Sequence, residues 1–144
     1  MKRTAVAFAI ALALGIPASC GGGTDPNRLD AGACFDLPSQ TDRIGDVRAR
    51  SCTEPHRGEV FHVFETDRAA ATYPTDLEWE EIVYPICDPF FETYTGTDVG
   101  SRTDIDYRYL VPTEDRWAGG DRRVTCFIVS LDGSPLTRSF RAGA

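Results

Sequence analysis

The sequence is poor in the residue patterns that usually carry catalysis or bind metal ions. It has only two histidines, His56 and His62, and they do not form the His-Glu-x-x-His pattern of zinc enzymes. No Cys-x-x-Cys pair and no Gly-x-Ser-x-Gly turn occurs, so neither a zinc-thiolate site nor a Ser-His-Asp hydrolase is indicated. We therefore expect no metal site, no cofactor and no catalytic residues.

An excess of positive charge is also missing. The chain has 15 Lys and Arg against 22 Asp and Glu, and its formal net charge is −7. Loss of Lys2 and Arg3 with an export segment would make this charge two units more negative, because every acidic residue lies beyond residue 20. Such a charge argues against nucleic acid and anionic lipid head groups as partners.

The apolar run at the N-terminus is too short to cross a bilayer. It extends from residue 5 to residue 16 and follows Lys2 and Arg3, whereas a spanning helix needs about 20 apolar residues. This layout predicts a secretory signal peptide over residues 1–19. A retained membrane anchor is the less favoured alternative.

Cys20 is the predicted site of lipid attachment. The sequence Ala18-Ser19-Cys20 resembles the end of a bacterial lipobox, although Pro17 stands where the lipobox usually has leucine. Two acyl chains would hold the protein stably on the outer face of the cytoplasmic membrane. Cleavage after Ser19 and secretion without lipid is the alternative.

The rest of the chain is predicted to contain a tether and one domain. Residues 20–33 are rich in Gly, Asp, Asn and Pro and are expected to form a flexible tether. Residues 34–144 have the length of one domain, and the chain's 42% hydrophobic and 10% aromatic residues can supply its core.

The domain contains an even number of cysteines, which in an exported chain indicates disulfides. Four cysteines allow three pairings, and we favour the sequential one, which joins Cys34 to Cys52 and Cys87 to Cys126. Cys20 is then left over, which favours its lipidation. Zinc is the alternative use of the four thiolates, but they are not closely spaced in pairs.

Alternating and β-branched residues predict a mostly antiparallel sheet. Residues 60–64 are apolar on both alternating faces, which is typical of a central strand covered on both sides. Further strands are expected over residues 43–51, 106–111, 124–129 and 136–140. Leu131-Asp132-Gly133-Ser134 predicts the hairpin turn that leads to the last of these, an edge strand.

One helix is expected between the strands. Thr75-Asp76-Leu77-Glu78 fits a capping box, and Pro85 is expected to kink or break the helix. An apolar face with near-helical spacing follows the cap, formed by Leu77, Ile82, Ile86, Phe90 and Tyr94. The predicted fold is therefore α+β, with one helical layer on the sheet and two disulfides.

A few residues are candidates for a functional surface. Glu54 and His56 lie in a turn beside Cys52, where a structural histidine is the favoured reading. Trp117 precedes Asp121 and Arg122, and it is either an exposed ligand-stacking residue or, more often in such positions, a side chain packed over a sheet corner. The catalytic signal is weak everywhere.

Two motifs taken together resemble the septum formation family, small extracytoplasmic domains of actinobacterial envelope proteins. The first is Cys52-Thr53-Glu54-Pro55-His56, followed by Glu59-Val60-Phe61. The second is Trp117-Ala118-Gly119-Gly120-Asp121-Arg122, which leads into Cys126. The resemblance also includes Ala33-Cys34-Phe35-Asp36 and Tyr109-Leu110-Val111-Pro112-Thr113. It implies a role near division septa and implies no catalytic residues.

The leading hypothesis is a non-enzymatic binding or scaffolding lipoprotein with an envelope protein or cell-wall partner. A cell-wall hydrolase or other envelope enzyme is the alternative, and it would need convergent titratable groups in a cleft. A small-ligand carrier is the second alternative, and it would need a sizeable apolar pocket.

Overall fold

The computed structural model describes residues 24–25, 28–36, 47–68 and 72–144. The predicted signal peptide over residues 1–19 and the predicted lipidation site Cys20 lie outside the described residues. Within the described residues, neither helix is both long enough and apolar enough to cross a membrane.

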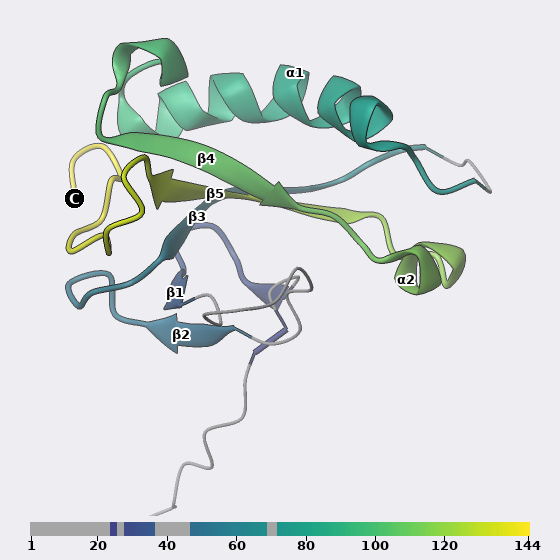
Figure 1. Cartoon of the computed structure of the whole chain (residues 1–144), viewed down its shortest axis with the longest axis horizontal. Helices are drawn as coiled ribbons and strands as arrows, with labels where there is room; N and C mark the ends of the chain where they lie inside the picture. Colours follow the sequence, from purple (N-terminus) through teal and green to yellow (C-terminus); the bar gives the residue numbers. More distant parts are fainter. Residues whose placement is uncertain (1–23, 26–27, 37–46, 69–71) are drawn as a thin grey trace, which may run out of the picture.

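The fold is a five-stranded antiparallel sheet with one long helix on one face, which confirms the predicted α+β class (Figure 1). The strand order is β2-β1-β3-β5-β4. The strands are β1 Cys34–Asp36, β2 Arg48–Arg50, β3 Gly58–Glu65, β4 Ile105–Leu110 and β5 Arg123–Ser130. The helices are α1 Asp76–Thr95 and the short α2 Glu114–Ala118, with a 3-10 turn at Val99–Ser101.

Strand β3 lies at the centre of the sheet, as the apolar pattern of residues 60–64 predicts. Phe61 belongs to the larger core cluster, on the α1 side of the sheet. Val60 packs on the opposite face with Phe35, Phe127 and Leu29. A register shift between Val60 and His62 places an extra residue in β3 opposite β5, as in a β-bulge.

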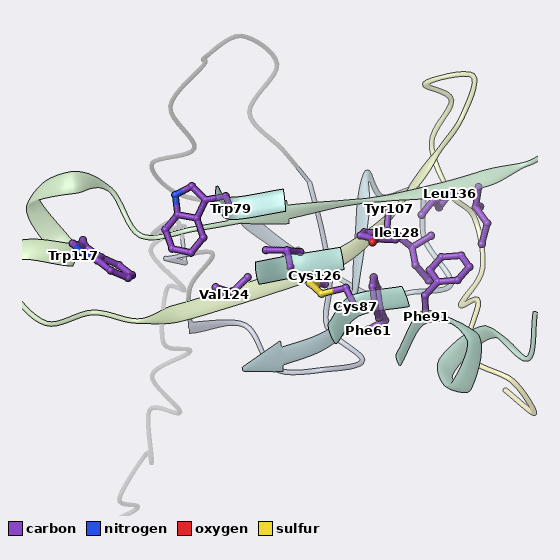
Figure 2. Close-up of a cluster of buried hydrophobic side chains, with 12 residues drawn as sticks. Phe61, Trp79, Cys87, Phe91, Tyr107, Trp117, Val124, Cys126, Ile128 and Leu136 are labelled. Carbon is purple, nitrogen blue, oxygen red and sulfur yellow. A yellow bond between two sulfur atoms is a disulfide. The ribbon is translucent and has the colours of Figure 1, made fainter. Parts of the chain in front are cut away.

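Both predicted disulfides are present, Cys34–Cys52 and Cys87–Cys126. The first joins the start of β1 to the turn before β3, with 5.2 Å between the two Cα atoms. The second joins the middle of α1 to β5 in the larger core cluster (Figure 2). The helix is therefore attached to the sheet both by packing and by a covalent bond.

Helix α1 begins with the predicted capping box but buries a different face from the predicted one. The Thr75 hydroxyl accepts from the Glu78 backbone, and the Glu78 carboxylate accepts from the Thr75 backbone. The buried residues are Trp79, Val83, Cys87, Phe91 and Thr95. Leu77 is 65% exposed and Phe90 is 44% exposed. The reason is that Cys87 is bonded to the sheet, which turns the stripe containing Cys87 inward.

The predicted kink or break at Pro85 does not divide the helix, which runs as one element through both Pro85 and Pro89. Both prolines lie on the exposed side. A proline costs a helix one backbone donor and crowds the preceding turn. Water can solvate the carbonyls that lose this donor, while the opposite face of α1 stays packed.

The predicted edge strand over residues 136–140 is wrong. This segment makes a single bridge, between Leu136 and His56. The turn before it is present, with Gly133 at a φ of 74°. The segment cannot join β5 because β3 and β4 already occupy both sides of that strand.

Two further boundaries differ from the prediction. Strand β2 is limited to Arg48–Arg50, and residues 43–46 of the longer predicted strand lie outside the described residues. The described part of the predicted tether packs on the domain: Leu29 is buried, and the Asp25 carboxylate lies 2.8 Å from Arg116. The apolar Leu29 side chain and this ion pair hold that segment against the sheet.

Candidate functional site

The candidate surface residues lie at two opposite ends of β3. Glu54 and His56 come just before β3 begins at Gly58. Arg122 lies at its other end, where its carbonyl accepts from the Thr66 amide. An eight-residue strand is about 26 Å long. The structure therefore does not bring the candidates together into one patch.

His56 is completely buried. Its Nδ1 atom lies 2.8 Å from the Glu54 carbonyl, and because a carbonyl can only accept, Nδ1 carries the proton. The His56 backbone also exchanges two hydrogen bonds with Leu136. This arrangement fits the structural reading of His56, and in it no substrate can reach the imidazole from solvent.

Trp117 is also buried, with 2% of its surface exposed. Its ring packs edge-to-face against Trp79 and Tyr73. The Arg122 guanidinium lies 3.7 Å from the ring centroid, which is a cation–π geometry. Trp117 therefore packs over the corner of the sheet and is not available as a ligand-stacking residue.

Asp121 and Arg122 fix the turn between α2 and β5. The Asp121 carboxylate accepts from Arg116 Nε at 2.8 Å and from the Arg123 backbone at 3.0 Å. Arg122 donates to the carbonyls of Trp117 and Arg68. The contacts of Trp117, Asp121 and Arg122 thus give the Trp-x-x-Gly-Asp-Arg motif a structural role in the turn between α2 and β5.

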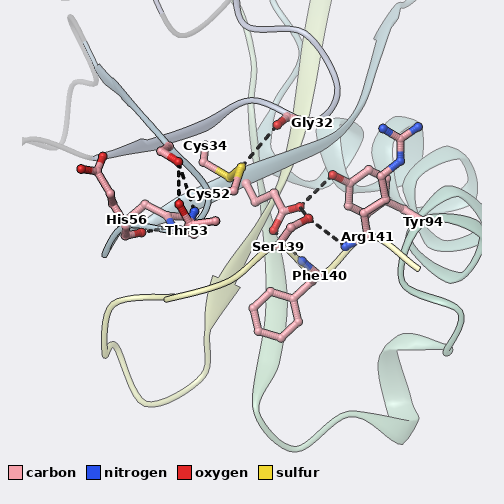
Figure 3. The surroundings of a disulfide bond; sticks show 12 residues. Gly32, Cys34, Cys52, Thr53, His56, Tyr94, Ser139, Phe140 and Arg141 are labelled. Atoms are coloured by element: carbon pink, nitrogen blue, oxygen red, sulfur yellow. Dashed lines mark hydrogen bonds between the residues drawn. A yellow bond between two sulfur atoms is a disulfide. The ribbon is translucent and has the colours of Figure 1, made fainter. Parts of the chain in front are cut away.

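Glu59 is the residue that the sequence reasoning did not single out as a site. It is the one carboxylate that is buried among the described residues. Its Oε1 atom accepts from the Tyr94 hydroxyl at 2.8 Å and from the Ser139 hydroxyl at 2.6 Å, and Oε2 accepts from the Phe140 amide at 2.8 Å (Figure 3). The signal in the sequence is an acidic residue that begins an apolar strand.

The electrostatics around Glu59 affect Tyr94 most. Burial raises the pKa of the Tyr94 hydroxyl well above its usual range, and the hydrogen bond to the Glu59 carboxylate and the charge of that carboxylate raise it further. The tyrosine therefore stays protonated and remains a donor. One carboxylate thus connects the central strand, the end of α1 and the C-terminal segment.

The Glu59 carboxylate also lies next to a disulfide. Its oxygen and the sulfur atoms of Cys34 and Cys52 all fall within 4.8 Å of one another. Both sulfur atoms are used in the bond between these cysteines, so they are not thiolates and cannot bind a metal ion in this state. The zinc alternative does not apply to these two cysteines.

A groove opens between α1 and the end of β3 together with the segment that follows it. The two elements run in opposite directions: Tyr94 contacts Glu59, the Phe90 ring stacks on His62 with centroids 3.5 Å apart, and Glu78 pairs with Arg68. Between the last two contacts lies a hollow of about 540 Å³. It is lined by Glu65, Thr66, Asp67, Arg68, Ile82, Pro85 and Ile86.

A second hollow, of about 500 Å³, lies beside the turn after β5. Its polar lining includes Asp132 and Arg138. Hydrogen bonds from the hydroxyls of Ser130 and Ser134 lower the pKa of Asp132 to about 2. These bonds, together with the Ser134 amide, hold the turn in place.

These observations define a small α+β domain that is cross-linked by two disulfides. The residues of its two sequence motifs that the structure explains, such as His56 and Trp117, have structural roles. A family model described as septum formation matches residues 31–143. The chain belongs to the septum formation family, as the two motifs predict. Searches of curated proteins and of solved structures found no match. The family membership indicates a role in cell division or in the envelope.

Proposed function

We propose that this chain is a lipid-anchored binding or scaffolding module of the cell envelope, acts near division septa and has no catalytic activity. The observation that carries the proposal is the environment of Glu59. Three donors of the protein itself occupy this buried carboxylate, so its charge serves the fold instead of a reaction.

The position of the other candidate groups supports the same proposal. His56 is buried, and Trp117 and Arg122 are packed against each other. A hydrolase needs an acid, a base or a nucleophile that a substrate can reach. Among the candidates in the described part of the chain, Glu54 is exposed, but it has no accessible acid, base or nucleophile of the same set beside it. The His56 imidazole is buried, and Asp121 and Arg122 lie at the other end of β3.

Export and anchoring are supported by the chemistry of the cysteines. Disulfides form and persist in oxidising compartments outside the cytoplasm, and both pairs are bonded here. The arrangement of Lys2, Arg3 and the apolar run before Cys20 adds the signal for export and lipid attachment. The proposed location is the outer face of the cytoplasmic membrane.

Chemical cross-linking in intact cells, followed by purification of the chain under denaturing conditions, tests the proposal. We expect a defined envelope protein or cell-wall fragment to be captured during division. The control is the same chain with Cys20→Ser, which should not remain on the membrane. Turnover of cell-wall material by the purified chain would contradict the proposal and favour the hydrolase alternative.

A further inference from the structure

The described residues cover only the first half of the β3 edge that faces away from β5. Strand β1 pairs with β3 at Gly58 and Glu59 alone. Two further hydrogen bonds follow: the Gly32 amide donates to the Val60 carbonyl, and the Val60 amide donates to the Ala33 carbonyl. Beyond Val60, no strand within the described residues pairs with this edge. In agreement, His62, Val63 and Phe64 are partly exposed and Glu65 is exposed.

The backbone groups on this edge can be identified from the strand period. The Thr66 amide donates to the Arg122 carbonyl and so faces the β5 side. Backbone groups of successive residues in an antiparallel strand alternate between its two neighbours. Phe64 therefore also faces β5, whereas the amides and carbonyls of Val63 and Glu65 point to the open edge.

Helix α1 supplies an apolar wall beside the same edge. Ile82, Pro85 and Ile86 line the groove from the helix side. The stack of Phe90 on His62 lies at one end of the groove, and the pair of Arg68 and Glu78 lies at the other. An open strand edge beside a helix wall is a geometry in which an extended peptide can add as a further strand, with its alternate side chains against the helix.

The charges in the groove select the chemistry of the peptide. Glu65 and Asp67 line it, and the one cationic side chain in its lining, Arg68, is already paired with Glu78. Pro85 lacks the amide that would donate to the Glu81 carbonyl, which leaves this oxygen as a further acceptor on that side of the helix. The groove thus offers acceptors and negative charge, which suits a peptide with Lys or Arg.

We propose that the groove between β3 and α1 binds an extended segment of a partner protein, in which small apolar or β-branched residues alternate with Lys or Arg. This inference rests on the proposed binding function and identifies its surface. The segment pairs with the backbone of Val63 and Glu65, places apolar side chains against Ile82 and Ile86, and brings a cation to Glu65 and Asp67.

The test uses the processed chain, residues 20–144 with Cys20→Ser, and a capped ten-residue peptide that alternates valine or threonine with lysine. Amide hydrogen exchange, resolved by NMR, is measured with and without the peptide. We expect the Val63 and Glu65 amides to become protected when the peptide is added, while Phe64, already bonded to β5, changes little. Exchange at Val63 and Glu65 that does not respond to millimolar peptide would overturn the proposal.

Two matched pairs of variants locate the binding surface. Glu65→Pro removes the outward amide and the charge, whereas Glu65→Gln removes only the charge. We expect the Kd for the peptide to rise about tenfold for Glu65→Pro and about two- to threefold for Glu65→Gln. Ile86→Lys should raise the Kd about tenfold, and Leu77→Lys, on an exposed part of the same helix, should leave it unchanged. Equal affinities within both pairs would contradict the assignment.

Other occupants of the groove give different results in the same experiment. Protection of Val63 and Glu65 in the dilute chain without peptide would mean that another segment of this chain covers the edge. Protection that rises with protein concentration would mean that a second copy covers it. Either result overturns the proposal of a partner peptide.

The outcome also separates this proposal from the proposed function. If cross-linking in cells captures the same partner with the wild-type chain and with Ile86→Lys, the groove is the wrong surface and the scaffolding function stands. If the purified chain turns over cell-wall material, the proposed function fails even when the peptide protects Val63 and Glu65.

Discussion

The Glu59 carboxylate accepts a hydrogen bond from the Tyr94 hydroxyl at 2.8 Å, across 35 positions of the sequence. This contact joins the central strand to the last turn of α1 inside the core. Because Glu59 also holds Ser139 and Phe140, it fixes the C-terminal segment that does not form a strand. The Glu59 side chain thus joins three parts of the fold: the central strand, the end of α1 and the C-terminal segment.

Tyr94→Phe should destabilise the protein, because it removes a donor from a buried carboxylate. A hydrogen bond to a charged group contributes about 1.5–3 kcal/mol, so we expect the free energy of unfolding to fall by about this amount. Urea denaturation followed by circular dichroism measures it. Tyr84→Phe is the control, because the Tyr84 side chain is exposed, and it should change stability by less than about 0.5 kcal/mol. Equal stability of the two variants would show that the Glu59 contact contributes little.

Stability should fall as the pH rises above about 10, the usual pKa of tyrosine. Burial, first of all, raises the pKa of both Tyr94 and Tyr107 in the folded protein, and hydrogen bonds to Glu59 and Asp88 raise it further. Above pH 10 the unfolded chain then binds fewer protons than the folded one, so the free energy of unfolding decreases with pH. The stabilisation that these two tyrosines give the folded protein is complete below pH 10.

Urea denaturation at pH 8, 9, 10 and 11 measures this effect. The decrease above pH 10 should be smaller in Tyr107→Phe and smallest in the double variant Tyr94→Phe and Tyr107→Phe. A decrease of the same size in the double variant would mean that other groups cause it. The experiment uses Cys20→Ser, because a thiolate at high pH can exchange with the disulfides.

Each disulfide should contribute to stability, and the Cys87–Cys126 bond should contribute more. Its loop of 39 positions is longer than the 18 positions between Cys34 and Cys52. The chain-entropy model gives about 4 kcal/mol for the longer loop and about 3 kcal/mol for the shorter one. Urea denaturation of the two double Cys→Ala variants compares the two contributions.

Peptide mapping without reductant checks the pairing. A peptide that joins Cys34 to Cys87 would contradict it.

Cys20 should carry a lipid in the native protein. The reason is the sequence Ala18-Ser19-Cys20 after the apolar run, together with two disulfides that use the other four cysteines. Mass spectrometry of the N-terminal peptide from membranes should show Cys20 as the first residue with a diacylglyceryl group. Replacement of Pro17 by Leu should make processing faster if the lipobox departure matters. An unmodified Cys20 in the mature protein would leave secretion without lipid as the explanation.

The local features of this fold could be predicted from the sequence because they depend on neighbouring residues. The capping box at Thr75, the turn around Gly133 and the strand after Gly58 each follow from side chains within a few positions. The sequence allowed three disulfide pairings, and the sequential pairing that we favoured is the one present. The motifs that begin at Cys52 and at Trp117, taken together, predicted the family, although they did not identify a site.

The features that depend on distant contacts could not be predicted. The helix has two apolar stripes, and the stripe with Trp79 and Val83 is buried because it packs on the sheet and contains Cys87, which is bonded to Cys126. The local pattern around Leu136 predicts an edge strand, but β5 has no open side because β3 and β4 flank it. The role of Glu59 could not be predicted, because its three donors lie far along the chain, at Tyr94, Ser139 and Phe140.

His56→Ala should lower stability and should not remove an activity. The change deletes the hydrogen bond from Nδ1 to the Glu54 carbonyl, which contributes about 0.5–1.5 kcal/mol, and it leaves a small cavity in addition. Differential scanning calorimetry measures the loss as a lower Tm. Capture of a partner by cross-linking should then decrease only as far as folding does.

Two conservative variants separate this structural role from acid–base chemistry. The amide nitrogen of Asn can replace Nδ1, whereas that of Gln comes closer to the position of Nε2. Within the described residues nothing hydrogen-bonds to Nε2, so His56→Asn should keep more of the stability than His56→Gln. A catalytic imidazole would give the opposite pattern: both variants would fold and both would lose turnover of a cell-wall substrate, by about 10²–10⁴-fold. Melting temperature and turnover measured on one preparation distinguish the two roles, and a stable His56→Asn protein that loses a hydrolytic activity would refute the non-enzymatic function.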